Sequence, residues 1–134
     1  MRMIFVNLPV QDLERAKRFL EAIGFAFEPN WSNDQTACMT LEENIHVLLH
    51  THARFKDFIA GEIADTSRGT EALLCLSASS REEVDCTLET ALAAGGRPWL
   101  PKQDMGPMYG CSFQDPEGHV WELSYVDLAA LQPA

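Results

Sequence analysis

The sequence predicts an α+β fold built from two copies of one βαβββ module, and two observations support this prediction. An apolar strand, a capped helix that ends at glycine and then further strands begin near Ile4, and the same order begins again near Ala72. At an internal period of roughly 70 residues, each copy is too small to bury a core alone. The two copies are therefore expected to pack as curved sheets around a cleft, where the function is sought.

The first copy opens with an apolar strand over residues 4–10. A helix is predicted over 12–23, because apolar residues recur there at three- and four-residue spacing behind the capping residue Asp12. Gly24 suits the left-handed turn that ends a helix. Extended segments are then expected at 25–27, 36–41 and 45–50.

The second copy opens with a strand over 73–77, and its helix is predicted over about 80–94. Ser79 or Ser80, followed three residues later by glutamate, forms a capping box. The residues expected on the buried face of this helix are Val84, Leu88, Ala91 and Leu92. Strands over 109–114 and 120–125 are joined across 115–118, where Pro at the second position and Gly at the fourth fit a type I turn.

The predicted organisation is a single domain over 1–134. It comprises module 1 at about 1–52, a connector at about 53–71 and module 2 at about 72–127. The connector is the least regular part and carries only a weak helical pattern around Phe55, Phe58 and Ile59.

Composition excludes several classes of function. The net charge of −10 opposes binding to nucleic acid, which relies on clustered lysine and arginine. No apolar run approaches the roughly 18 residues of a membrane span, and no signal peptide is evident, so we expect a cytoplasmic protein without a membrane partner. Four cysteines without a Cys-x-x-Cys pair predict free, mostly buried thiols.

Short signatures along nearly the whole chain together carry a family resemblance. They are Leu8–Leu13 entering the first helix, Gly24-Phe25 after it, Gly95-Gly96 after the second helix, and Asp115–His119 before a strand that contains Trp121-Glu122-Leu123. The chain resembles the vicinal oxygen chelate superfamily, which contains glyoxalases, bleomycin-resistance proteins and extradiol dioxygenases. The resemblance implies βαβββ modules that form a curved, barrel-like mixed sheet, a cavity that often holds a divalent metal, and a homodimer.

The metal is expected to be absent. The resemblance places Phe5, Leu48, Leu73 and Glu122 at the four positions where metal-dependent relatives hold the ion. Of these, only Glu122 can coordinate a cation, and one carboxylate among apolar groups does not make a site. The alternative is a displaced divalent-metal site at His46, His50 and Glu122, because strand alternation puts both histidines on the face of Leu48.

Glu122 is the candidate catalytic residue. It is either a structural carboxylate satisfied by its neighbours or a general base and hydrogen-bond acceptor for a ligand. Further residues are candidates for ligand binding, as polar contacts or as adaptable apolar lining. These are Phe5, Asn7, Trp31, Met39, Leu48, His50, Trp99, Met108, Tyr109 and Ser124.

The leading hypothesis is a glyoxalase/bleomycin-resistance-like protein that binds a small, partly apolar molecule in the barrel cleft, without a cofactor. The acidic chain favours a neutral or cationic ligand. One alternative is a divalent-metal-dependent lyase, isomerase or dioxygenase of the same superfamily. A second alternative is a non-catalytic dimeric structural module.

Overall fold

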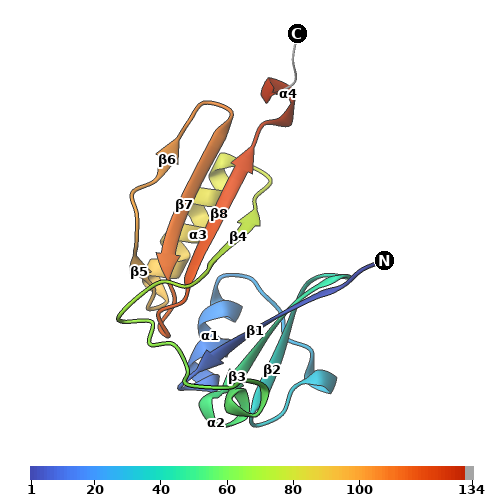
Figure 1. Ribbon diagram of the computed structural model, residues 1–134. Coiled ribbons are helices and arrows are strands. Elements are labelled where there is room, and N and C mark those ends of the chain that lie inside the picture. The colour runs from blue at the N-terminus through green and yellow to red at the C-terminus, as the bar shows by residue number, and fades with distance from the viewer. Residues whose placement is uncertain (132–134) are drawn as a thin grey trace. The chain divides into compact units, whose positions relative to one another are not determined.

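The computed structural model describes residues 1–131, so the last three residues of the predicted domain lie outside the described residues. The chain divides into two compact units (Figure 1). The first comprises Met1–Asp65 and the second begins at Thr66. This boundary falls inside the connector predicted over 53–71. Each unit is a mixed α+β structure with its own sheet and helix, as the repeat predicts.

The first unit contains a three-stranded sheet in the order β1-β3-β2. Its elements are β1 (Ile4–Val10), α1 (Leu13–Ala22), the 3-10 helix η1 (Pro29–Trp31), β2 (Thr36–Glu42) and β3 (Ile45–Thr51). Strand β1 runs parallel to β3, and β2 runs antiparallel to it. The strand predicted at 25–27 is reduced to one bridge between Phe27 and Met39, because η1 turns the chain away two residues later.

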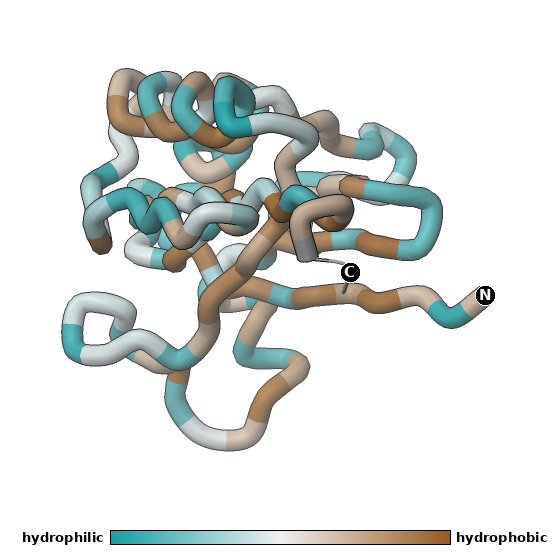
Figure 2. The backbone as a smooth tube through the Cα atoms, turned by 90° about the horizontal axis from the view of Figure 1, so that it is seen from above, coloured by the Kyte–Doolittle hydropathy of each residue, from teal (hydrophilic) through white to brown (hydrophobic). Residues whose placement is uncertain are grey.

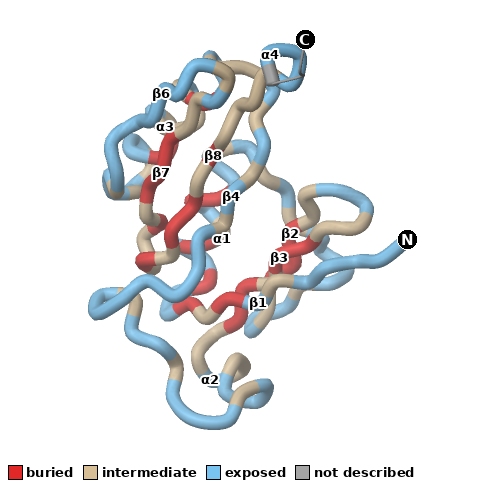
Figure 3. The backbone as a smooth tube through the Cα atoms, turned by 45° about the horizontal axis from the view of Figure 1, so that its top comes forward, coloured by how far each residue is buried: buried red, intermediate tan, exposed pale blue. Residues whose placement is uncertain are grey.

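Helix α1 covers one face of this sheet. Asp12 caps it, accepting a hydrogen bond from the Arg15 amide at 3.0 Å. Its apolar stripe is buried as predicted at Leu13, Ala16, Phe19 and Leu20. In Figure 2, β1, which follows the N-terminal end, is hydrophobic over most of its length. Burial is greatest in the central strands, such as β3 in the first unit and β7 (Met108–Gln114) in the second (Figure 3).

Two short helices follow the first sheet, at the weak helical pattern of the connector. They are α2 (His52–Phe55) and the 3-10 helix η2 (Lys56–Phe58). Thr51 caps α2 through its hydroxyl, which accepts a hydrogen bond from the Arg54 amide at 3.3 Å.

The second unit contains a five-stranded sheet in the order β4-β8-β7-β5, with β6 also paired to β7. Its elements are β4 (Leu73–Ser77), α3 (Arg81–Ala93), β5 (Arg97–Pro98), β6 (Gln103–Asp104), β7, β8 (Val120–Val126) and α4 (Leu128–Leu131). Its first strand runs parallel to its last, and its last runs antiparallel to the one before, as in the first unit. The two units therefore share this pairing pattern, although the first has a three-stranded sheet instead of the four strands of the predicted βαβββ module.

Helix α3 packs on one face of this sheet, against β7 and β8 (Figure 1). The predicted capping box is present: the Ser80 hydroxyl accepts from the Glu83 amide at 3.0 Å, and the Glu83 carboxylate accepts from the Ser79 amide at 2.8 Å. Val84 and Ala91 are fully buried. The prediction was wrong for Leu92, which is 37% exposed because it lies at the edge of the buried stripe.

The turn before β8 is organised by Asp115, a carboxylate that is only 4% exposed. Its Oδ1 accepts from the amides of Glu117 and His119, both at 2.9 Å, and its Oδ2 accepts from Trp121 Nε1 at 3.0 Å. The Gly118 amide closes the predicted turn onto the Asp115 carbonyl at 2.9 Å. Burial raises the pKa of Asp115, whereas the charge on His119 and these N–H donors oppose the rise. Part of the family signature thus has a structural role.

No helix within residues 1–131 is both long enough and apolar enough to cross a membrane. The four cysteines are free, as predicted. Only Cys38 and Cys111 are buried, whereas Cys75 and Cys86 are exposed. The expectation of mostly buried thiols therefore holds for half of them.

Candidate functional site

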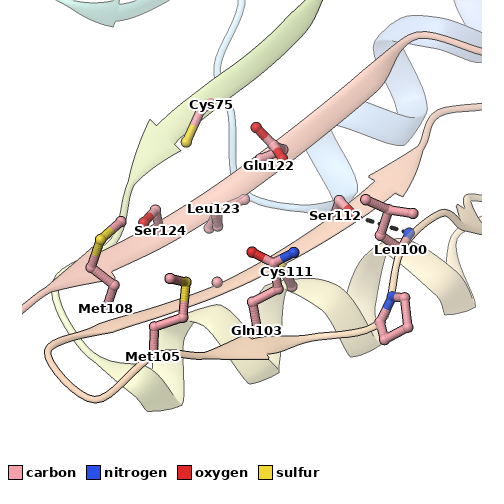
Figure 4. Close-up of a pocket in the computed structure, with 12 residues that line it drawn as sticks. Cys75, Leu100, Gln103, Met105, Met108, Cys111, Ser112, Glu122, Leu123 and Ser124 are labelled. Carbon is pink, nitrogen blue, oxygen red and sulfur yellow. Dashed lines mark hydrogen bonds between the residues drawn. The ribbon is translucent and has the colours of Figure 1, made fainter. Parts of the chain in front are cut away.

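A cavity of about 200 Å³ lies on the face of the second sheet that α3 does not cover. Strands β4, β7 and β8 form its floor, and the segment between β5 and β7 forms its outer wall (Figure 4). The lining residues are Cys75, Leu100, Pro101, Gln103, Met105, Met108, Gly110, Cys111, Ser112, Glu122, Leu123 and Ser124. Thioether, aliphatic and hydroxyl groups therefore surround one carboxylate.

Strand register explains why these side chains meet. In β8, Glu122 and Ser124 are two residues apart, so they point to the same face. Glu122 is paired with Cys75 in β4 and with Ser112 in β7. The Ser112 hydroxyl accepts a hydrogen bond from the Leu100 amide at 3.1 Å, which ties the start of the outer wall to the floor (Figure 4).

Glu122 is the only charged side chain among the lining residues. Within the described part of the chain, its carboxylate has neither an ion pair nor a hydrogen bond, so both oxygens are available to a bound molecule. This arrangement favours the second of the two interpretations of Glu122, a ligand acceptor, over a carboxylate satisfied by its neighbours.

Cys75 lies next to Glu122 but is not an activated nucleophile. Although the residue is exposed, partial desolvation of its sulfur raises the pKa of the thiol, and the negative charge of Glu122 raises it further. Since the thiolate is the reactive form of cysteine, the thiol is protonated at neutral pH and acts as a polarisable part of the cavity wall.

The predicted site residues of the second unit divide into two groups. Glu122, Ser124 and Met108 line the cavity. Trp99 is half-buried and does not line it. Tyr109 points to the opposite face, where its hydroxyl donates to the Asp85 carboxylate of α3 at 2.6 Å. Sequence reasoning placed Tyr109 on the same surface as Met108, although consecutive strand residues face opposite sides.

In the first unit, the face that α1 leaves uncovered brings together four predicted residues. The pairing of β1 with β3 places Phe5, Asn7, Leu48 and His50 on this face. Met39 lies on the opposite face, fully buried in the layer of Val47, so the structure places it in the core. Trp31 is 60% exposed.

His50 is buried in a chain of hydrogen bonds across this sheet. Its Nε2 donates to Asn7 Oδ1 at 2.7 Å, and its Nδ1 accepts from the Thr36 hydroxyl at 2.8 Å. The side chain is only 3% exposed and lies against the rings of Phe55 and Phe58. Both ring nitrogens are therefore used within the protein.

His46 lies four residues before His50 on the same face of β3 and makes a similar cross-strand bond. Its Nδ1 accepts from the Thr40 hydroxyl at 3.0 Å, and its Nε2 donates to the Glu43 carbonyl at 3.3 Å. Its ring stacks on Phe5 and on Trp31, with centroid distances of 5.0 and 6.1 Å. Two cross-strand Thr–His pairs therefore stabilise this sheet.

The donor set does not fit the metal that the resemblance implies. Phe5, Leu48 and Leu73 have no donor atom, and the ring nitrogens of His46 and His50 are hydrogen-bonded to protein groups. Within residues 1–131, no three His, Cys, Asp or Glu side chains gather closely enough to hold an ion.

The stability of the first unit is expected to fall in mild acid because of His50. Burial, and to a lesser extent Arg54, lowers the pKa of His50 below its ordinary value of 6.5. Below about pH 6.5, His50 is protonated in the unfolded chain but stays neutral in the folded chain. The free energy of unfolding therefore falls as the pH drops, by up to about 1.4 kcal/mol per pH unit. Urea unfolding from pH 8 to 5, together with NMR titration of the His50 ring, measures this effect.

Substitution Arg54→Gln tests how much the charge of Arg54 contributes to the lowered pKa of His50. It should raise the pKa of His50 only part of the way to 6.5, because burial is the larger cause. Titration of His50 above 6.5 in the wild-type protein would contradict the prediction.

Nine lining residues were not among the predicted site residues: Cys75, Leu100, Pro101, Gln103, Met105, Gly110, Cys111, Ser112 and Leu123. The signal for Cys75 and Ser112 was their register with Glu122, which requires the strand pairing to be known. The segment that carries Leu100, Gln103 and Met105 shows no hydrophobic periodicity, so its path could not be predicted from the sequence.

Comparisons with known proteins agree with this fold. Among solved structures, a hypothetical protein from S. aureus matches over 93% of this chain and 94% of its own, with 23% identity and a TM-score of 0.79. A glyoxalase/bleomycin resistance protein/dioxygenase family enzyme from Burkholderia phytofirmans PsJN matches over 94% and 99%, with 19% identity and a TM-score of 0.78. A glyoxalase-related enzyme from Fulvimarina pelagi matches over 93% and 88%, with 22% identity and a TM-score of 0.77.

The repeated modules and these likenesses define a protein of the glyoxalase fold class. A family model described as bleomycin resistance protein-like N-terminal matches residues 2–41. With the structural likenesses, this match confirms the resemblance to the vicinal oxygen chelate superfamily that the sequence predicts. The comparison with curated proteins finds no match.

Proposed function

We propose that the protein binds a small, partly apolar molecule in the cavity of the second unit, and that Glu122 is its polar anchor. The observation that carries this proposal is a carboxylate that has no hydrogen-bond or ion-pair partner among residues 1–131 and lies inside a largely apolar cavity. Binding sites for small molecules combine apolar walls with a few placed polar groups in this way. A single acidic group favours a ligand with a positive charge or a strong hydrogen-bond donor.

Glu122 also meets the first requirement of a general base, since its carboxylate is free to accept a proton from a bound molecule. The proposal therefore includes proton transfer as the chemistry open to this site. The protonated Cys75 thiol does not support covalent catalysis.

We further propose that binding needs no resident metal. The support is the donor chemistry at Phe5, Leu48 and Leu73, whose side chains cannot coordinate a cation. Metal analysis of the purified protein tests this, and a stoichiometric divalent ion that survives dialysis would contradict it.

Two further proposals, a barrel-like closure of the sheets and a homodimer, rest on the family resemblance alone. Light scattering, which measures the molecular mass in solution, tests the homodimer. Four free cysteines support a reducing, cytoplasmic location.

Substitution Glu122→Gln is expected to weaken the binding of small organic cations. A charged hydrogen bond contributes about 1.5–3 kcal/mol, so affinity for benzylamine should fall roughly tenfold to a hundredfold. Affinity for benzyl alcohol, which has the same size but no charge, should change by less than about threefold. Titration calorimetry of both probes measures the difference.

Glu89→Gln is the matched control, because it removes the same charge from an exposed position on α3 outside the cavity. It should leave both affinities unchanged. Equal weakening by the two variants would show that net charge, and not Glu122, attracts the cation, and the proposed site would then be wrong.

A further inference from the structure

The outer wall of the cavity is exposed along its whole length. We use this name for residues 100–106, every one of which is exposed, although Leu100, Gln103 and Met105 line the cavity. Apolar burial therefore contributes little to holding the wall against the floor. At one end, the Leu100 amide is bonded to Ser112, and further along β6 pairs with β7.

The Met105 amide also donates to the Met108 carbonyl at 2.8 Å, and two side chains of α3 add an ionic attachment. Arg81 donates to both oxygens of Asp104, at 2.9 and 3.0 Å, and to the Gly106 carbonyl at 2.8 Å. Asp85, one helical turn later, accepts from Lys102 Nζ at 2.7 Å. The helix thus holds the wall through two ion pairs, which we call the ionic clamp.

Tyr109 of β7 connects the two halves of the ionic clamp. The Arg81 guanidinium lies over its ring, 4.7 Å from the centroid, and its hydroxyl donates to Asp85 at 2.6 Å. The bond from Arg81 lowers the pKa of Asp104, and the bond from Lys102 lowers the pKa of Asp85. Both carboxyl groups are therefore charged at neutral pH.

We propose that Arg81 and Asp85 are positioning residues for the cavity: through the ionic clamp they hold the outer wall beside the binding site, and release of the clamp widens the cavity for a ligand. Exposed ion pairs are weakened by salt, and little apolar surface opposes opening, so the wall is released more easily at high ionic strength. The inference rests on the proposed function only in assuming that the cavity takes a ligand.

Two measurements that need no ligand test the ionic clamp. Amide hydrogen exchange of residues 100–106 should be about threefold to tenfold faster in Arg81→Gln and in Asp85→Asn than in the wild type. Trypsin cleavage after Lys102, which requires the wall to leave the sheet, should be faster by a similar factor. In the wild type, 1 M NaCl should accelerate both processes.

The control is Arg54→Gln, which breaks a comparably exposed ion pair with Asp57 in the first unit and should change neither rate. The charge-exchanged variant Arg81→Asp/Asp104→Arg should restore slow exchange, which a purely structural role of Arg81 on the helix would not predict. Unchanged exchange of the wall in both single variants would overturn the proposal, as would equal acceleration across α3. Because these readouts involve no ligand, failure of Glu122→Gln to affect binding would leave them intact.

Discussion

Substitution Asp115→Ala is expected to destabilise the protein by about 3–5 kcal/mol, the cost of leaving three N–H donors without their shared acceptor. The amides of Glu117 and His119 and the Trp121 indole would lose their shared acceptor in a site that is 4% exposed in the native protein. Urea unfolding, followed by circular dichroism, measures the loss.

The variant Asp115→Asn distinguishes the contribution of Oδ1, which accepts from two backbone amides, from that of Oδ2, which accepts from the indole. Its amide oxygen can still accept from the two backbone amides, whereas its NH₂ group would face the indole N–H, a second donor. We therefore expect a smaller loss of about 2 kcal/mol, and the same substitution should cost less in a Trp121→Phe background, which lacks the indole N–H. An Asp115→Ala variant as stable as the wild type would show that the network is not required.

The structural role of Asp115 also bears on how the family signature is interpreted. Asp115, Gly118 and Trp121 build the turn and the core beneath β8, whereas Glu122 of the same signature points into the cavity. A single short motif therefore combines a structural half with a functional half. Resemblance in the structural half supports the fold, and only the identity of the side chains on the cavity face supports a function.

The fold was predictable because its determinants are local. Capping at Asp12 and Ser80 marks both helix starts, and glycines in left-handed conformation at 24 and 95 follow both helices. Repetition of this order along the chain gave the module, and the pairing confirms it. The extended segment expected at 25–27 forms only one bridge to β2, because Pro29 starts a helical turn instead of continuing the extended chain.

The site was predictable only where alternation within one strand was sufficient. Once Glu122 is assigned to the cavity face of β8, Ser124 must lie on the same face, because strand residues two apart share a face. The same rule separates Met108 from Tyr109, and following it strictly would have assigned Tyr109 to the helix side. The outer wall could not be predicted, since its position depends on ion pairs between residues about 20 apart in sequence, such as Arg81 and Asp104.

Substitution Gly118→Ala is the second change expected to have a large effect, a loss of about 2–4 kcal/mol. Gly118 has a φ of +90°, which costs an L-residue roughly 1–2 kcal/mol. A Cβ there would also lie 2.3 Å from Thr66 Oγ1 and 2.8 Å from Thr66 Cβ, so one of the two residues must move. Thr66 is held in place because its hydroxyl donates to the Glu117 carbonyl at 2.8 Å.

A double-mutant cycle with Thr66→Gly divides this loss into its two causes. In the Thr66→Gly background the added methyl group meets neither atom, so Gly118→Ala should cost only the backbone term of about 1–2 kcal/mol. Thermal and urea unfolding of the four proteins measures the coupling. A cost of Gly118→Ala that is equal in both backgrounds would show that the close approach of Thr66 is relieved by movement of the turn, and that the left-handed backbone alone requires glycine at this position.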